Sequence, residues 1–138
     1  MNKHATGTFE VNLNPLDLNE VGDGETRGRI SINKTFRGDL EATSIGEMLS
    51  AMTEVKGSAG YVAMERVVGT LQGHQGSFVL QHSGTMNRGV ASLSVTVVPD
   101  SGTGELAGLK GALNINIREG VHCYGLDYSL EDPAGVPL

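Results

Sequence analysis

Two side chains that can exchange protons occur at matching places in a predicted β-hairpin. Glu65 is the one acid within the apolar-rich run 61–71, and His82 is the one basic-type side chain within the run 77–86. Antiparallel strands joined by the turn at 71–76 can place both side chains on one face. If that face is buried, burial and mutual charge shift the pKa values of both groups. The pair predicts acid–base chemistry, a ligand contact, or a buried ion pair that fixes strand register.

A second group of candidates comes from the run 121–130. His122, Tyr124 and Tyr128 share one face of this predicted strand, and Tyr61 can join them from the run 61–71. A tyrosine offers a ligand an apolar ring and one orienting hydroxyl, although packing in a core or interface is the alternative role. The candidate ligand-binding residues are therefore Glu65, His82, Tyr124, His122, Tyr61 and Tyr128. The sequence assigns none of them a catalytic role.

Metal and cofactor sites have little support in this sequence. His82, His122 and Glu65 make a formal two-histidine, one-carboxylate set, but they lie on separate predicted strands. The single cysteine, Cys123, excludes an internal disulfide and a cysteine-based zinc site. The glycines at 102–104 lack the Lys-Ser/Thr that completes a phosphate-binding loop. We predict no metal and no cofactor.

Alternation of apolar and polar residues predicts eight strands that position these side chains. The expected ranges are 5–13, 26–36, 40–46, 61–71, 77–86, 90–98, 111–118 and 121–130. Pro15 is expected to end the first strand, because proline lacks the amide donor of the ladder. Gly22, Asp23 and Gly24 are expected to turn the chain, residues 100–111 to form a glycine-rich loop, and residues 133–138 a tail.

The run 40–55 fits two structures. Helix spacing and a resemblance of Ser44 and Glu47 to a capping box favour a short helix over 47–52. The residues at helix spacing are Ile45, Met48, Leu49 and Met52. The neighbouring segments are strands joined by short turns, and a meander needs a strand here. We therefore expect a strand over 40–46 that continues irregularly to residue 52, with the helix as the alternative.

Length and composition limit the fold class, the partners and the location that this chain can be expected to have. A length of 138 residues predicts one domain covering 1–138. A net charge of -6 without a basic stripe argues against nucleic acid and anionic membranes as partners. Twenty glycines between short β-branched runs indicate a turn-rich all-β domain. The start lacks a secretory apolar region and no run of 18 apolar residues occurs, so we expect a cytoplasmic protein.

Short sequential connections favour an antiparallel meander that closes into an eight-stranded barrel. Closure removes both exposed edges, and eight strands leave an interior that side chains fill or that holds one small ligand. Some strands carry apolar residues on both faces, as at Val67 with Val68 and Val79 with Leu80. Part of the outer wall is therefore expected to be covered by a second subunit, giving a homodimer.

Three segments together carry a resemblance to a known family. Residues 63–86, 97–111 and 122–130 resemble a bacterial family of uncharacterised proteins, whose fold is similar to the barrel of allene oxide cyclase. The resemblance covers about residues 5–130 and implies an eight-stranded antiparallel barrel. It implies no activity, and none of the cyclase's catalytic residues has a match here.

Three functions follow as hypotheses. The first is a barrel that binds an apolar or amphipathic small molecule in its interior. The second is an isomerase or cyclase that uses acid–base residues in the same cavity, and the third is a filled barrel acting as an oligomeric interaction module. An interior cavity of roughly 300 Å³ or more would favour the first two over the third.

Overall fold

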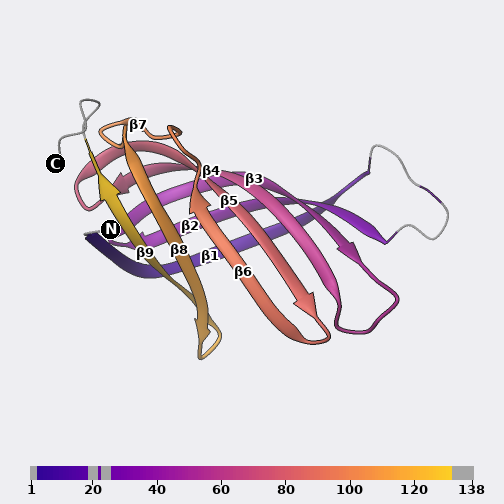
Figure 1. The fold of residues 1–138 in the computed structure, drawn as a ribbon. Coiled ribbons are helices and arrows are strands. Elements are labelled where there is room, and N and C mark those ends of the chain that lie inside the picture. Colours follow the sequence, from indigo (N-terminus) through magenta and orange to yellow (C-terminus); the bar gives the residue numbers. More distant parts are fainter. Residues whose placement is uncertain (1–2, 19–21, 23–25, 132–138) are drawn as a thin grey trace.

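The computed structural model describes residues 3–18, 22 and 26–131, which form an antiparallel β-barrel (Figure 1). Ladder order runs β4-β3-β2-β1-β9-β8-β6-β5, and β5 pairs with β4 to close the barrel. The expected all-β, eight-stranded fold is confirmed. The strands are β1 (Lys3–Leu16), β2 (Arg27–Gly38), β3 (Leu40–Met52), β4 (Ala59–Leu71), β5 (His74–Asn87), β6 (Val90–Val97), β7 (Thr103–Gly104), β8 (Leu109–Arg118) and β9 (Val121–Leu130).

The ambiguous segment is a strand along its whole length. β3 pairs with β4 from Leu40↔Leu71 to Met52↔Ala59 without a break. The helix alternative over 47–52 is therefore wrong. The helix-like spacing arises because β3 carries apolar side chains on both faces: Ile45 is exposed on the outer face, whereas Met48 lines the interior.

Pro15 does not end the first strand as predicted. β1 continues to Leu16 and pairs Pro15 with Ile30 of β2. Along its other side β1 pairs with β9 only from Lys3 to Phe9. Beyond that point one edge of β1 has no neighbouring strand among the described residues, so a residue without an amide donor is tolerated there.

The β4–β5 connection is tighter than the turn expected over 71–76. Gln72 and Gly73 form it, with φ of 43° and 90°. Two successive residues with positive φ match the twist of the flanking strands, as in a two-residue hairpin turn. Gly76 lies within β5, opposite Gly69 and beside Gly104.

The glycine-rich loop contains a short regular element that the sequence did not predict. β7 adds two residues to the edge of β5 through Ser77↔Thr103 and Gly76↔Gly104. This pairing holds the loop across one end of the barrel, where Leu106 is fully buried. The loop therefore closes that end.

The same end of the barrel is filled by side chains. The core cluster includes five aromatic side chains, all buried: Phe9, Phe36, Phe78, Tyr124 and Tyr128. The remaining core residues are aliphatic: Ala5, Leu40, Ala42, Val67, Leu71, Leu80, Val95, Val97, Leu106, Leu109, Leu113, Leu126 and Leu130. The opposite end, near the β5–β6 and β8–β9 turns, is where the interior stays hollow.

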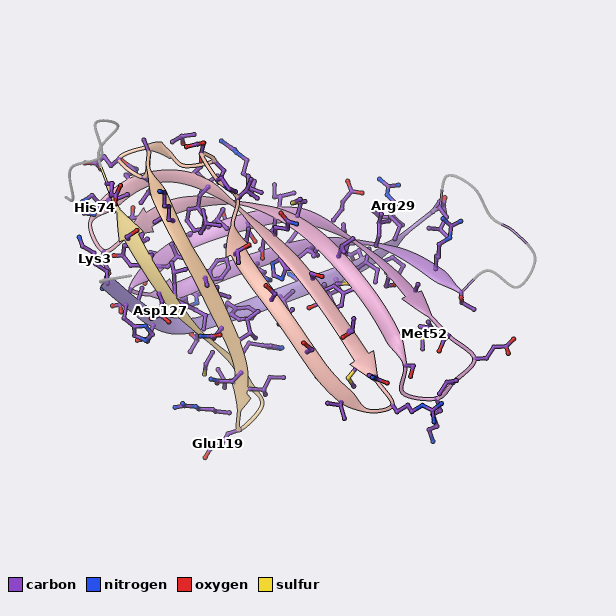
Figure 2. The ribbon with its side chains drawn as sticks, in the orientation of Figure 1. Lys3, Arg29, Met52, His74, Glu119 and Asp127 are labelled. Atoms are coloured by element: carbon purple, nitrogen blue, oxygen red, sulfur yellow. The ribbon has the colours of Figure 1, made fainter. Side chains whose placement is uncertain are left out.

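One seam of the barrel is weak. In the described part of the chain, the ladder between β6 and β8 consists of the single pair Thr96↔Ala112. Figure 1 shows the β5–β6 and β8–β9 hairpins diverging towards their turns, and Figure 2 marks Glu119 at the tip of the second. Closure at this seam therefore depends mainly on the packed end.

Two expectations fall outside the described residues. These are the turn at Asp23 and Gly24 and the tail at 133–138. Within residues 3–18, 22 and 26–131, no helix is long and apolar enough to cross a membrane.

Candidate functional site

A buried polar cluster lies midway along the barrel interior, centred on Glu65. Its Oε1 accepts hydrogen bonds from Lys34 Nζ at 2.8 Å and from His82 Nε2 at 2.5 Å. Its Oε2 accepts a hydrogen bond from Ser44 Oγ at 2.6 Å. Relative exposures are 1% for Glu65, 4% for His82 and 8% for Lys34. The cluster therefore places three ionisable side chains within hydrogen-bonding distance in a site largely removed from water.

Strand register brings these side chains together from four adjacent strands. Ser44 of β3 lies opposite Lys34 of β2, and one inward position further along β3, Gly46 lies opposite Glu65 of β4. His82 of β5 pairs with Ala63, two residues from Glu65 on the same face of β4. The predicted meeting of Glu65 and His82 on the inner face is confirmed.

Gly46 lets the backbone of β3 lie close against Glu65. A Cβ added at Gly46 would overlap the Met64 carbonyl oxygen and the Cα and Cβ of Glu65. Only glycine lets β3 and β4 approach this closely without a shift of one strand.

The surroundings of Glu65 favour its ionised form. Burial is the largest influence on its pKa and by itself raises it. The hydrogen bond from His82, the charge and hydrogen bond of Lys34 and the hydrogen bond from Ser44 together outweigh burial. The pKa of Glu65 falls from 4.5 to about 2. At neutral pH the carboxylate is an acceptor only, so His82 Nε2 carries the hydrogen of their bond.

A cavity of about 250 Å³ lies between the cluster and the open end of the barrel. Lys34 and His82 line its floor, and its wall is mostly aliphatic and aromatic. The lining residues are Phe9, Val11, Leu13, Ile32, Lys34, Met48, Tyr61, Ala63, His82, Leu93, Ile115, Ile117 and His122. The volume is below the roughly 300 Å³ that we expected of a ligand site, so the cavity is large enough only for a small molecule. The interior is thus half filled and half open.

Two further predicted residues, Tyr61 and His122, lie in the cavity wall. The ring of Tyr61 lies against Gly84, where an added Cβ would overlap it. Burial raises the pKa of the Tyr61 phenol, which keeps its hydroxyl a neutral donor and acceptor. The His122 ring packs against Phe9, with ring centroids 5.1 Å apart.

The structure does not bring Tyr124 and Tyr128 to this cavity. The Tyr124 hydroxyl donates to the Arg37 carbonyl at 3.0 Å and accepts from the Leu40 amide at 2.9 Å. The Tyr128 hydroxyl donates to the Gln72 side chain. Both tyrosines belong to the packed end, where their hydroxyls tie β9 to turns of the barrel. We expected Tyr124 to be a ligand contact, but its hydroxyl is occupied by the backbone.

Sequence reasoning missed Lys34 and Ser44. Lys34 alternates in step with Ile32 and Phe36. The sequence therefore already indicated a charged residue on the apolar face of a predicted strand. Its ammonium lies 4.9 Å from the centre of the Phe9 ring, a cation–π distance. Ser44 gave no comparable signal, because a small hydroxyl residue is common on either face.

A larger hollow of about 700 Å³ lies on the outer face of β3, β4 and β5. Its apolar part is formed by Ile45, Leu49, Val62 and Met64. The remaining lining residues are Arg29, Gly46, Glu47, Ala63, Gln81 and His82. Figure 2 shows Arg29 projecting from the outer side of the sheet. Of the buried polar cluster, His82 lines this outer groove but Lys34, Ser44 and Glu65 do not, so we regard the smaller inner cavity, which both Lys34 and His82 line, as the candidate site.

Within the described ranges, no group of three or more His, Cys, Asp or Glu side chains is placed to hold a metal ion. The two histidines of the cavity therefore do not converge with Glu65 on one point. His82 contacts Glu65, whereas His122 packs on the opposite wall beside Phe9.

Comparison with known proteins gives a family but no activity. The family described as "Protein of unknown function (DUF3224)" matches residues 5–128. A crystal structure of a protein of unknown function from this family, from Shewanella oneidensis MR-1, is 53% identical. It has a TM-score of 0.88, and the match covers 94% of this chain and 98% of that chain. A comparison with curated proteins gives no match. The expected membership of an uncharacterised bacterial family is confirmed: the chain belongs to the DUF3224 family.

Proposed function

We propose that this protein binds a small, largely apolar molecule in the open half of the barrel. The observation that carries the proposal is the contrast between the two halves of the interior. One half is filled by core side chains, whereas the other is a cavity of about 250 Å³ with an apolar wall and a polar floor. Such a combination of apolar walls and few convergent polar groups is typical of ligand sites.

The polar floor supports the proposal energetically. Replacing a buried ion pair by apolar side chains of similar volume is often neutral or stabilising. Lys34, Glu65 and His82 are therefore not needed merely to fill the barrel. Lys34 and His82, both in contact with Glu65, offer directed hydrogen bonds at the bottom of an apolar cavity, which is what orienting a ligand requires.

Native mass spectrometry tests the proposal. The protein is purified from the cells that make it, and its mass is measured before and after denaturation. We expect a small molecule to be released from the wild-type protein. Ala63→Leu adds apolar bulk directly above the floor and is expected to remove it. Val62→Leu, the neighbour on the outer face, serves as the matched control and is expected to retain it.

If the wild-type protein carries no small molecule, and small apolar probes show no affinity for it, the binding proposal is wrong. A molecule retained equally by Ala63→Leu would place the binding site elsewhere on the protein.

A second candidate function is self-association through the outer groove. Ile45, Leu49, Val62 and Met64 form an exposed apolar strip along β3 and β4, and Ile45 is 73% exposed. Monomeric proteins rarely leave such contiguous apolar surface uncovered. We propose a second copy of this chain as the occupant, forming the homodimer expected from the sequence.

Local charge favours a second copy at this face. The chain has a net charge of -6, so most contacts between copies bring like charges together. Glu47 is the acid of the strip and lies between Ile45 and Leu49. It pairs with Arg29 at 2.8 Å, and Arg66 lies opposite Ile45. A twofold axis through the strip would bury apolar surface while each Glu47 stays paired with its own Arg29. Molar mass from light scattering over a range of concentrations tests this: a mass of one chain throughout would contradict it.

Two expectations from the sequence stay predictions. They are the cytoplasmic location and the likeness of the barrel to that of allene oxide cyclase.

A further inference from the structure

The floor of the cavity has an unused donor. An ammonium group has three N–H donors, and among the described residues Lys34 Nζ has one hydrogen-bond acceptor, Glu65 Oε1. Two N–H groups are left without a protein acceptor, although the Phe9 ring lies near the charge. Lys34 lines the cavity, so these donors are available to a bound molecule.

Beside it lies an unused nitrogen of His82. Its Nε2 is committed to Glu65, and its Nδ1 makes no hydrogen bond within the described part of the chain. Among those residues the one fully buried side-chain nitrogen or oxygen without a partner is His74 Nδ1, so His82 Nδ1 keeps some exposure, and His82 lines the cavity. With Nε2 holding the hydrogen, a neutral imidazole offers Nδ1 as an acceptor.

The charges of the floor compensate one another. Lys34 and Glu65 form a close ion pair whose two charges compensate each other. A ligand ammonium would be repelled by the ammonium of Lys34, and the carboxylate of Glu65 is already paired with Lys34. A ligand carboxylate would bring an unbalanced negative charge into a low-dielectric site, which is costly unless a proton is taken up. The titratable groups facing His82 and this cavity are Lys34, Glu65, Tyr61 and His122.

From this arrangement we infer that the bound molecule has an uncharged, oxygen-bearing head, a carbonyl in its simplest form, held by Lys34 Nζ with its apolar body towards the barrel mouth. This inference rests on the proposed function. A hydrogen-bond donor next to the carbonyl, as in an amide, would also be accepted by His82 Nδ1.

Three probes with the same chain length test the head group: 2-octanone, octanoate and octylamine, each titrated calorimetrically into the wild-type protein at pH 8. We expect 2-octanone to bind at least about tenfold more tightly than octylamine, because a charge-assisted hydrogen bond is worth that much. We expect it to bind more tightly than octanoate, because the unbalanced charge of octanoate is costly in a low-dielectric site. Lys34→Met keeps the length of the side chain and is expected to weaken 2-octanone binding about tenfold. Lys110→Met, an exposed lysine of β8, is the matched control and is expected to leave it unchanged.

The outcomes separate this inference from the proposed function. If the three probes bind equally well, or if octanoate binds most tightly at pH 8, the cavity binds ligands but does not select an uncharged head. If no probe binds the wild-type protein better than it binds Ala63→Leu, both the inference and the binding proposal fail. The comparison of probes needs no variant at the floor, so it stands even if Lys34→Met does not fold.

Discussion

Glu65 is the residue on which the interior of this barrel depends. It is almost completely buried, yet its pKa is lowered to about 2, because three donors from β2, β3 and β5 converge on its two oxygens. A carboxylate in that position is tolerated only while its partners are present. The same carboxylate sets the tautomer of His82 and holds the ammonium of Lys34 at the cavity floor.

Glu65→Gln is expected to destabilise the protein by about 3–5 kcal/mol, because Lys34 becomes a buried cation without its counter-charge. Urea denaturation measures the change in the free energy of unfolding. Glu47→Gln is the control, since it breaks a more exposed pair with Arg29 and is expected to cost no more than about 1 kcal/mol. Equal effects of the two substitutions would show that the buried cluster has no special importance for stability.

The lowered pKa of Glu65 makes stability depend on pH in the acid range. Because the folded-state pKa of about 2 lies below the ordinary 4.5, the cluster's contribution is present above pH 4.5 and is lost as pH falls towards 2. At one pKa unit per 1.36 kcal/mol, this contribution is about 3 kcal/mol. Other carboxylates also titrate here, so the difference between wild type and Glu65→Gln is the relevant quantity. We expect that difference to shrink between pH 5 and pH 2, and a constant difference would contradict the assignment.

At the scale of the strands, the ladder between β6 and β8 distinguishes this barrel from a uniform one. β3 and β4 share thirteen consecutive pairs, whereas β6 and β8 share the single pair Thr96↔Ala112. Leu93 and Ile115, which lie on these two strands, line the cavity. The weakest seam therefore borders the candidate site, and the strands there can separate at a lower cost than elsewhere.

Amide hydrogen exchange is expected to show this difference along the chain. Among the described residues, amides of β6 at 91–94 and of β8 at 113–117 that face the seam have no strand partner, so they should exchange much faster than amides of β3 and β4. A bound ligand is expected to slow exchange at the seam more than in the β3–β4 ladder. Uniform protection of all eight long strands would show that the seam is closed in solution.

At the scale of the whole molecule, the acidic chain carries an apolar strip on the outer faces of β3 and β4, within which the acid Glu47 is paired with Arg29. Covering that strip with a second copy would remove Ile45, Leu49, Val62 and Met64 from water. The inner cavity lies on the other side of the same strands, since Met48 and Ala63 line it. A dimer formed there would hold one wall of the cavity rigid without covering the β6–β8 seam.

Ile45→Lys is expected to shift the protein from dimer to monomer, because it places a charge at the centre of the apolar strip. Light scattering measures the molar mass against that of one chain, 14.5 kDa. Val90→Lys changes a residue of comparable exposure, 70%, at the start of β6 and is expected to leave the mass unchanged. A wild-type monomer, or a dimer that survives Ile45→Lys, would contradict the proposed interface.

Much of this protein could be predicted from local sequence patterns. Strand alternation and glycine turns led to eight strands, and inward parity placed Glu65 and His82 together, since a period of two determines which face each side chain occupies. Parity also placed His122 and Tyr61 inside. The local sequence was misleading at Pro15, because an unpaired edge tolerates a proline. It also left a helix open over 47–52 beside the expected strand, because apolar residues on both faces of a strand can imitate helix spacing.

Only the tertiary structure decided where along the barrel each inward side chain lies. Tyr124 and His122 share one face of β9. The hydroxyl of Tyr124 is nevertheless bound to the backbone at the packed end, whereas the ring of His122 lines the cavity. That division depends on the stagger of neighbouring strands and on Leu106, which reaches across one end from a distant loop. The partnership of Lys34 with Glu65 has the same origin. Parity follows from the chain alone, whereas depth in a closed barrel follows from the pairing of all its strands.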